Sequence, residues 1–255
     1  MIKIIHISDL HVGHHLEAIP EAFHEACALI KPDLFLISGD LTQRAKSWQF
    51  KALAEFLARL PAPYLVTPGN HDIPFFNAIA RLLWPFKQYK RHVSSTLEVS
   101  FRNADCRILG LNSVNPYEIK DGRLSEASLT KMKAFFQSEG QQLNILFFHH
   151  NFHYFEGMHN PLTNAEEFID YLKQSPIHIV CTGHLHYANI TLIEKNNGDN
   201  AMILHAGSLS CVRTRDKFNS FYVINNERLT CEVDRYVFDK GQFIPQEKFA
   251  VEFAK

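Results

Sequence analysis

The stretch KIIHISDLH, residues 3–11, is an apolar run that ends directly in two side chains able to bind a metal ion, Asp9 and His11. Further apolar runs end in the same way: LFLIS at 34–38, YLVT at 64–67, LNILFF at 143–148 and IHIVCT at 177–182. The residues that follow these runs are Gly39-Asp40, Pro68-Gly69-Asn70-His71-Asp72, His149-His150 and Gly183-His184-Leu185-His186. In open α/β sheets, ligands bind just beyond the carboxyl ends of the strands. The runs therefore predict one pocket that gathers Asp, Asn and His side chains as ligands for two divalent cations.

The composition is that of a soluble globular protein, with 46% hydrophobic and 21% charged residues among 255. This length is sufficient for one large domain, and we expect a single domain over residues 1–255. A net charge of −1 provides no long-range field, so neither stable nucleic-acid binding nor membrane association is expected. The five cysteines are widely spread and contain no C-x-x-C pair, and such free thiols favour a reducing, cytoplasmic location.

Helical periodicity separates the predicted strands. Apolar residues recur on one face over 46–60, and a second helix is predicted over 17–30. Ser125 is a predicted helix N-cap, and Thr163-Asn164-Ala165-Glu166 predicts a capping box that opens a helix ending before Pro176. This alternation of strand and helix favours a largely parallel sheet.

The last third of the chain is rich in β-forming residues. Strands are predicted at 190–194, 201–206, 218–224 and 229–237, separated by turns rich in Asn. Such hairpins predict that residues 187–238 contribute a second, mostly antiparallel sheet. The expected fold is therefore α/β, or α+β in some schemes: a four-layer αββα sandwich of two mixed β-sheets flanked by helices. The tail after Asp239 shows no pattern.

The predicted metal ligands offer nitrogen and oxygen atoms without thiolate. Asp9 and His11 lie two residues apart and can reach the same ion. Asp40 follows a glycine and can bridge two cations through its two oxygens. Such mixed ligation suits Mn, Fe, Zn or Ni. Two cations about 3.5–4 Å apart would activate a bridging water and stabilise both ends of an in-line phosphoryl displacement.

The motifs closely resemble those of the calcineurin-like metallophosphoesterase family, which are D-x-H, G-D, G-N-H-D/E, H and G-H-x-H in that order. The resemblance covers about residues 3–225. It implies that the first metal is held by Asp9, His11, Asp40 and His186, and the second by Asp40, Asn70, His149 and His184. It also implies that His71 is the acid that stabilises the transition state or protonates the leaving group. Asp72 is then expected to orient the His71 ring.

Residues 39–45, and the segments 111–113 and 121–125, resemble the bacterial cyclic-nucleotide-phosphodiesterase-like branch of that family. This resemblance implies hydrolysis of a small phosphodiester, such as a cyclic nucleotide, by attack of a metal-bridging hydroxide. The alternatives are a phosphomonoesterase or a pyrophosphatase acting on a nucleotide-sugar or lipid. A DNA nuclease and a non-catalytic binding scaffold are less favoured. The aromatic loop 151–162 departs from many relatives and is expected to shape a different substrate pocket.

Four further residues are candidates for contact with the substrate. Arg44 and Arg213 carry guanidinium groups, which match phosphate oxygens. His14 lies beside the D-x-H motif, and His150 follows a predicted ligand. No cluster of basic residues is evident beyond the metals, so a diester is expected to be hydrolysed faster than a monoester. The oligomeric state is not predicted.

Overall fold

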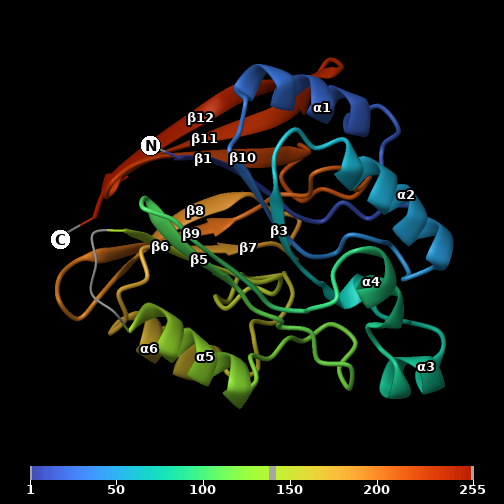
Figure 1. Ribbon diagram of the computed structural model, residues 1–255, viewed down its shortest axis with the longest axis horizontal. Coiled ribbons are helices and arrows are strands. Elements are labelled where there is room, and N and C mark those ends of the chain that lie inside the picture. Colours follow the sequence, from blue (N-terminus) through green and yellow to red (C-terminus); the bar gives the residue numbers. More distant parts are fainter. Residues whose placement is uncertain (1, 138–141, 254–255) are drawn as a thin grey trace.

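Two six-stranded β-sheets stack face to face, and helices cover their outer faces (Figure 1). The computed structural model describes residues 2–137 and 142–253. The first sheet has the strand order β12-β11-β10-β1-β2-β3, and the second has the order β4-β5-β6-β7-β9-β8. The strands of the first sheet are β1 (Ile2–Ile7), β2 (Leu34–Ser38), β3 (Tyr64–Thr67), β10 (Ser220–Glu227), β11 (Thr230–Asp239) and β12 (Gln242–Glu252). Those of the second are β4 (Val99–Arg102), β5 (Cys106–Gly110), β6 (Leu143–Phe147), β7 (Ile179–Thr182), β8 (Asn189–Glu194) and β9 (Asn200–His205).

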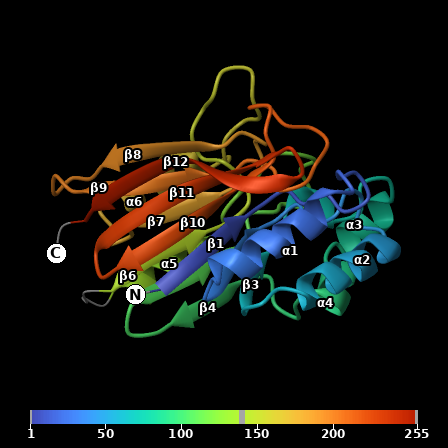
Figure 2. The ribbon, with the colours of Figure 1, turned by 90° about the horizontal axis from the view of Figure 1, so that it is seen from above.

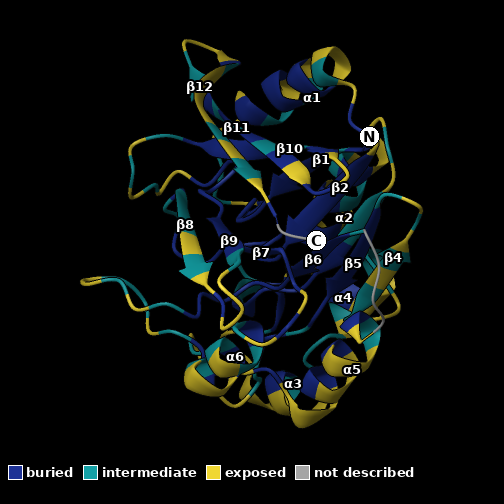
Figure 3. Cartoon of the chain, turned by 90° about the vertical axis from the view of Figure 1, so that its left-hand side faces the viewer, coloured by how far each residue is buried: buried dark blue, intermediate teal, exposed yellow. Residues whose placement is uncertain are grey.

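Helices lie on the outer side of each sheet. They are α1 (Ile19–Ile30), α2 (Ser47–Ala58), α3 (Ala78–Leu83), α4 (Lys87–His92), α5 (Glu126–Phe136) and α6 (Ala165–Leu172), with a 3₁₀ turn η1 at Asn70–Asp72. Figure 2 shows α1 lying along the first sheet, and Figure 3 shows buried strands at the centre with exposed outer faces on α5 and α6. None of the described helices has the length and apolar character needed to cross a bilayer.

The alternation of side chains along the strands creates these layers. In β1, Ile5 and Ile7 pack into the core beneath α1 and α2, whereas Ile2 and Ile4 pack into the core between the sheets. Successive side chains of a strand point to opposite faces, so an all-apolar strand is stable when both faces are covered. A third core lies between the second sheet and α5 and α6. The predicted four-layer sandwich is therefore confirmed.

Both sheets are mixed, as expected. Strands β1, β2 and β3 are parallel, while β10, β11 and β12 extend that sheet in antiparallel pairs. In the second sheet β5, β6, β7 and β9 are parallel, and the edge strands β4 and β8 are antiparallel to their neighbours.

The expectation that residues 187–238 all contribute to the second sheet is wrong. Only β8 and β9 belong to that sheet, whereas β10 and β11 join the first sheet beside β1. The reason lies in β10, where Phe221 and Val223 pack into the outer core and Tyr222 and Ile224 into the core between the sheets. A strand that is apolar on both faces needs cover on both sides, which the position next to β1 provides. The tail after Asp239, which shows no sequence pattern, forms the edge strand β12.

The predicted helices over 17–30 and 46–60 are present as α1 and α2, and Ser125 caps α5 by accepting a hydrogen bond from Ser128 N. The capping box predicted at Thr163-Asn164-Ala165-Glu166 is wrong. Helix α6 begins at Ala165, and its N-cap Asn164 makes no capping bond. The Asn164 amide instead bonds the backbone N–H and C=O of Leu124, at 3.2 and 3.0 Å.

The carboxyl ends of five strands meet at one edge of the sandwich, but they come from two sheets rather than one. Strands β1, β2 and β3 belong to the first sheet, and β6 and β7 belong to the second. Hydrogen bonds join the two sets of ends. His149 Nδ1 donates to the Ser38 carbonyl at 2.7 Å, and His184 N donates to Asp9 Oδ2 at 3.0 Å.

Candidate metal centre and active site

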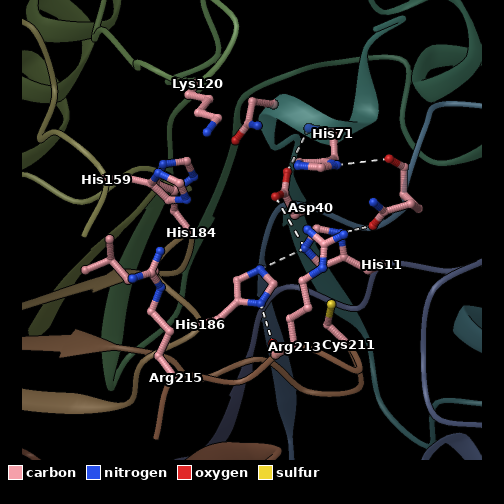
Figure 4. Close-up of a pocket in the computed structure, with 13 residues that line it drawn as sticks. His11, Asp40, His71, Lys120, His159, His184, His186, Cys211, Arg213 and Arg215 are labelled. Atoms are coloured by element: carbon pink, nitrogen blue, oxygen red, sulfur yellow. Dashed lines mark hydrogen bonds and ion pairs between the residues drawn. The ribbon is translucent and has the colours of Figure 1, made fainter. Parts of the chain in front are cut away.

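The seven predicted ligands converge at this edge in two groups, and Figure 4 labels four of them, His11, Asp40, His184 and His186. In the first group, His186 Nε2 lies 3.3 Å from Asp9 Oδ1, and His11 Nε2 lies 3.5 Å from Asp40 Oδ2. In the second, His149 Nε2 lies 3.3 Å from Asp40 Oδ1 and 3.2 Å from Asn70 Oδ1, and His184 Nδ1 lies 3.2 Å from His149 Nε2. The two oxygens of Asp40 therefore face different groups of ligands, which is the arrangement that a bridging carboxylate requires.

Unsatisfied buried atoms show that this donor set fits cations. His11 Nε2 and His186 Nε2 lie only 3.0 Å apart, with Asp9 Oδ1 beside them. Asp9 Oδ1 and His184 Nε2 are buried without a hydrogen-bond partner among the described residues. Buried polar atoms are normally paired, so the close approach of His11 Nε2, His186 Nε2 and Asp9 Oδ1 fits a positive ion between them.

Hydrogen bonds outside each group hold the imidazole rings. Three rings donate through Nδ1 to an oxygen, which turns Nε2 toward the ligand group, where a metal could replace its proton. They are His11 to Gln43 Oε1 at 2.9 Å, His149 to the Ser38 carbonyl at 2.7 Å, and His186 to the Arg213 carbonyl at 2.7 Å.

The backbone is strained where the ligands lie. Five of the ten non-glycine residues with positive φ in the described chain are predicted ligands: Asp9 (56°), His11 (48°), Asp40 (50°), His184 (71°) and His186 (53°). Such conformations are costly and persist where the surrounding structure imposes them. Gly39, at φ 84°, allows the chain to turn before Asp40, and a Cβ there would lie 2.7 Å from Gly69 N.

Charge balance couples the carboxylates to the histidines. Burial alone would raise the pKa of Asp40, but the nearby His149 and His71 hold it well below its usual value. Burial alone would lower the pKa of His149, but Asp40 raises it to about 9. Asp9 likewise raises the pKa of His186, against burial, to about 11. Protons on these histidines thus balance the carboxylates, and a bound cation would displace those protons.

His71 lies beside the ligands. Its backbone N–H donates to Asp40 Oδ1 at 2.8 Å, and its ring Nδ1 donates to the Gln43 carbonyl at 2.9 Å. The ring stands edge-on to that of His11, with 4.8 Å between the centroids. The Nδ1 bond holds the ring in place and leaves Nε2 for contact with a substrate.

The expected role of Asp72 in orienting His71 is wrong. Asp72 Oδ1 accepts from Thr42 N at 2.8 Å and from Thr42 Oγ1 at 3.1 Å, while Oδ2 accepts from Leu41 N at 3.1 Å and Gly69 N at 2.8 Å. Burial, with Asp40 beside it, raises the pKa of Asp72 to about 7, and the backbone N–H groups act in the opposite direction. Asp72 therefore ties the loop after β2 to the loop after β3, and the Gln43 carbonyl holds the His71 ring.

Two adjoining cavities open onto the ligands. One, of about 220 Å³, is lined by five of the predicted ligands and by His71, Lys120, His159, Cys211, Arg213 and Arg215. The other, of about 200 Å³, shares Asn70, His71, Lys120 and Arg213 with the first and adds Arg44, Phe75 and Ile119. The expectation of no basic cluster is therefore wrong, because four cationic side chains from three loops line these cavities: Arg44, Lys120, Arg213 and Arg215.

The four candidate substrate contacts differ in position. Arg44 and Arg213 both line a cavity, and Arg44 Nη1 lies 3.3 Å from His71 Nδ1. His150 is fully buried and lines neither cavity; its Nδ1 bonds Ser113 Oγ at 2.8 Å. His14 also lies outside both cavities. The two arginines therefore lie where they could contact a substrate in these cavities, whereas His150 is buried and does not face either cavity.

Residues outside the predicted set of ligands complete the site. Loop 151–162 contributes His159, whose ring lies 4.7 Å from that of His184, so this loop does shape the pocket. Arg215 Nη1 donates to the Gly157 carbonyl at 3.0 Å and holds the loop in place. Cys211 can place its sulfur within 4.8 Å of the His11 and His186 nitrogens, which brings a thiol close to a donor set expected to have none.

Comparison with known proteins places this geometry in a family. The family model described as calcineurin-like phosphoesterase matches residues 2–188. The chain is 30% identical over 178 residues to a protein of Arcobacter nitrofigilis named as a probable glycerophosphodiester phosphodiesterase, GpdQ, covering 65% of this chain and 60% of the relative. It is 26% identical over 198 residues to a probable cyclic nucleotide phosphodiesterase of Moraxella catarrhalis, covering 72% of this chain and 71% of the relative. The first of these matches thus spans less than two thirds of the relative's length.

A solved structure shares the fold. Purple acid phosphatase PPD1 from yellow lupin superposes with a TM-score of 0.74 at 12% sequence identity, over 98% of this chain and 53% of that chain. At this identity the similarity concerns the fold alone.

Proposed function

The chain belongs to the calcineurin-like phosphoesterase family, and from this premise we propose that it is a binuclear-metal phosphodiesterase acting on a small phosphodiester. The observation that carries the proposal is the position of Asp40, whose two oxygens face two separate groups of ligands. The names of the two curated relatives, both phosphodiesterases, support the choice of a diester.

Two divalent metals would be held by the seven converging side chains. Asp9, His11, Asp40 and His186 would hold the first, and Asp40, Asn70, His149 and His184 the second. Nitrogen and oxygen donors of this kind suit Mn, Fe, Zn or Ni. When bound, the metals supply Lewis-acid polarisation of the phosphoryl group and lower the pKa of water.

The chain's own residues bind the substrate and move a proton. Arg44, Lys120 and Arg213 stand around the cavities and would bind phosphoryl oxygens. Because His71 Nδ1 donates to the Gln43 carbonyl, Nε2 is the ring atom that would donate a proton to the leaving-group oxygen. Asp72 holds the loop that carries Asp40 and the loop that carries Asn70 in fixed positions relative to each other.

A phosphomonoesterase is the second candidate function, and the four cations favour it. A monoester carries one more negative charge than a diester at neutral pH, and Arg44, Lys120, Arg213 and Arg215 would balance that charge.

We also propose a reducing, cytoplasmic location, since all five cysteines are free and buried.

A metal-reconstituted assay tests both candidates. The protein is loaded with Mn, Fe, Zn or Ni in turn, its metal content is measured by elemental analysis, and bis-p-nitrophenyl phosphate is compared with p-nitrophenyl phosphate. We expect two ions per chain and faster hydrolysis of the diester. Faster hydrolysis of the monoester would favour the second candidate. A saturated protein that holds fewer than two ions, or hydrolyses neither ester, would refute the binuclear phosphoesterase.

A further inference from the structure

A large apolar surface lies beside the active site. Six of its side chains come from residues 75–84, which include α3: Phe75, Phe76, Ile79, Leu82, Leu83 and Trp84. Two more, Tyr117 and Ile119, come from the loop after β5. Phe76 and Tyr117 are about four-fifths exposed, at 82% and 80%. Contiguous apolar patches of this kind on a protein surface mark sites of interaction. In Figure 1, α3 lies at the lower right, beside α4 and farther from α1.

Arg81 holds the two segments of this apolar surface together. Its side chain is buried in α3, and among the described residues its guanidinium donates to three backbone carbonyls. Nε donates to the Pro116 carbonyl at 2.8 Å, Nη1 to the Pro74 carbonyl at 3.1 Å, and Nη2 to the Glu118 carbonyl. Hydrogen bonds to a charged donor are strong, so the apolar surface has a defined shape.

The apolar surface continues into the active site. Phe75 and Ile119 line the 200 Å³ cavity together with Asn70 and His71. Arg44 joins the two regions, since its guanidinium carbon lies 4.9 Å from the centre of the Phe75 ring and its Nη1 lies 3.3 Å from His71 Nδ1. One end of this cavity is therefore cationic and metal-binding, and the other end is apolar.

We propose that the substrate is an amphiphilic phosphodiester, with its phosphate at the metal centre and a hydrocarbon chain along the apolar surface. This inference rests on the proposed phosphodiesterase function. A hydrocarbon chain fits better than a nucleobase, because a base stacked on Phe75 would leave Ile79, Leu82 and Leu83 uncovered. The six residues of α3 extend the surface by about 9 Å beyond the cavity. The cations at the boundary match the phosphate of such a substrate.

A homologous series of substrates tests the proposal. Alkyl p-nitrophenyl phosphates with methyl, butyl and octyl chains share one leaving group and differ only in the chain. Each buried methylene contributes about 0.8 kcal/mol, which is about fourfold in binding, and partial burial on an open surface gives about twofold. We expect kcat/KM of the metal-loaded wild type to rise about 10²-fold from methyl to octyl, at concentrations below micelle formation.

Two variants test whether the dependence of kcat/KM on chain length arises at the apolar surface. Ile79→Ser/Leu83→Ser removes two side chains that are 69% and 61% exposed, so folding should be preserved. The matched control is Leu29→Ser, because Leu29 is 84% exposed on α1, outside both active-site cavities. We expect the double variant to lose most of the chain-length dependence and the control to keep it. In a Trp48→Phe background, Trp84 is the remaining tryptophan, and its fluorescence should shift to shorter wavelength with octylphosphonate but not with methylphosphonate.

The outcomes separate this inference from the proposed function. Turnover of the methyl ester with equal kcat/KM for the octyl ester would overturn the inference and leave the phosphodiesterase intact. No turnover of any diester would overturn both. A wild-type dimer that the double variant converts to a monomer, without chain-length dependence, would overturn the inference and assign the apolar surface to a second copy of the chain.

Discussion

Replacing Asp72 should destabilise the protein through the two loops that it joins. In Asp72→Ala, the buried N–H groups of Leu41, Thr42 and Gly69 lose their acceptor. A buried donor left without a partner costs about 1–3 kcal/mol, so for these three donors we expect a loss of about 3–9 kcal/mol in the free energy of unfolding. Asp72→Asn keeps one oxygen as an acceptor and turns an amide toward the other donors, so it should cost about 2–3 kcal/mol. Both variants should bind metal more weakly, because the loops that carry Asp40 and Asn70 are no longer fixed.

Urea unfolding of the metal-free proteins measures the loss, with Asp33→Ala as the control. Asp33 also accepts a backbone hydrogen bond, from Lys3 N at 2.8 Å, but in an exposed position where water can replace it. The control should therefore cost less than about 1 kcal/mol. An Asp72→Ala protein as stable as the control would refute the role of Asp72 as a tie between loops. Normal stability, combined with a rate loss confined to poor leaving groups, would instead restore a role in orienting His71.

Three other predictions follow from the site. Asp40→Asn should lower the rate by several orders of magnitude and reduce the metal content below two, measured by elemental analysis; normal turnover with two ions would remove the bridging assignment. His71→Ala should lose about 10²–10⁴-fold on an alkyl ester and much less on a nitrophenyl ester, with metals retained; equal losses on both would indicate electrostatic stabilisation rather than proton donation. Burial lowers the pKa of His6 and His205 to about 3, so the stability that they provide as neutral groups is complete above pH 6.5 and is lost as the pH falls. The two together should cost about 3 kcal/mol between pH 6.5 and pH 5, and His205→Gln should remove about half of that dependence in urea titrations; an unchanged slope would contradict it.

The convergence of the predicted ligands could be anticipated from the sequence because each of them lies shortly after the end of a strand. The carboxyl end of a strand has a known place in a sheet, so Asp9, Asp40 and His149 could be placed without knowing how the loops run. Lys120 and His159 could not be found in this way. They lie on loops whose path depends on tertiary contacts such as the bond from Arg215 to the Gly157 carbonyl.

The wrong predictions share a cause. A local sequence pattern indicates a strand or a turn, but it does not determine which distant strand or side chain that segment contacts. A hairpin pattern gives β10 and β11 but not the sheet that they join, which depends on cover for both faces of β10. Asp72 follows His71 in the sequence, which suggested contact between their side chains. The η1 turn carries the Asp72 carboxylate instead to the N–H groups of Leu41 and Thr42.

The positive φ angles of the predicted ligands would constrain any redesign of the metal preference. A residue at these positions must satisfy the ion and also tolerate a left-handed backbone. Asp, Asn and His adopt this conformation more readily than other non-glycine residues, and the positions concerned hold only Asp and His. Exchanges among these three types change the donor atoms at little conformational cost. Glu or Cys, at Asp9 or His186 for example, would add a backbone penalty to any gain in affinity. Fewer residue types can therefore be substituted at these positions than coordination chemistry alone would allow. Cys211 does not have a positive φ angle, so it is the position from which a sulfur ligand is most readily recruited.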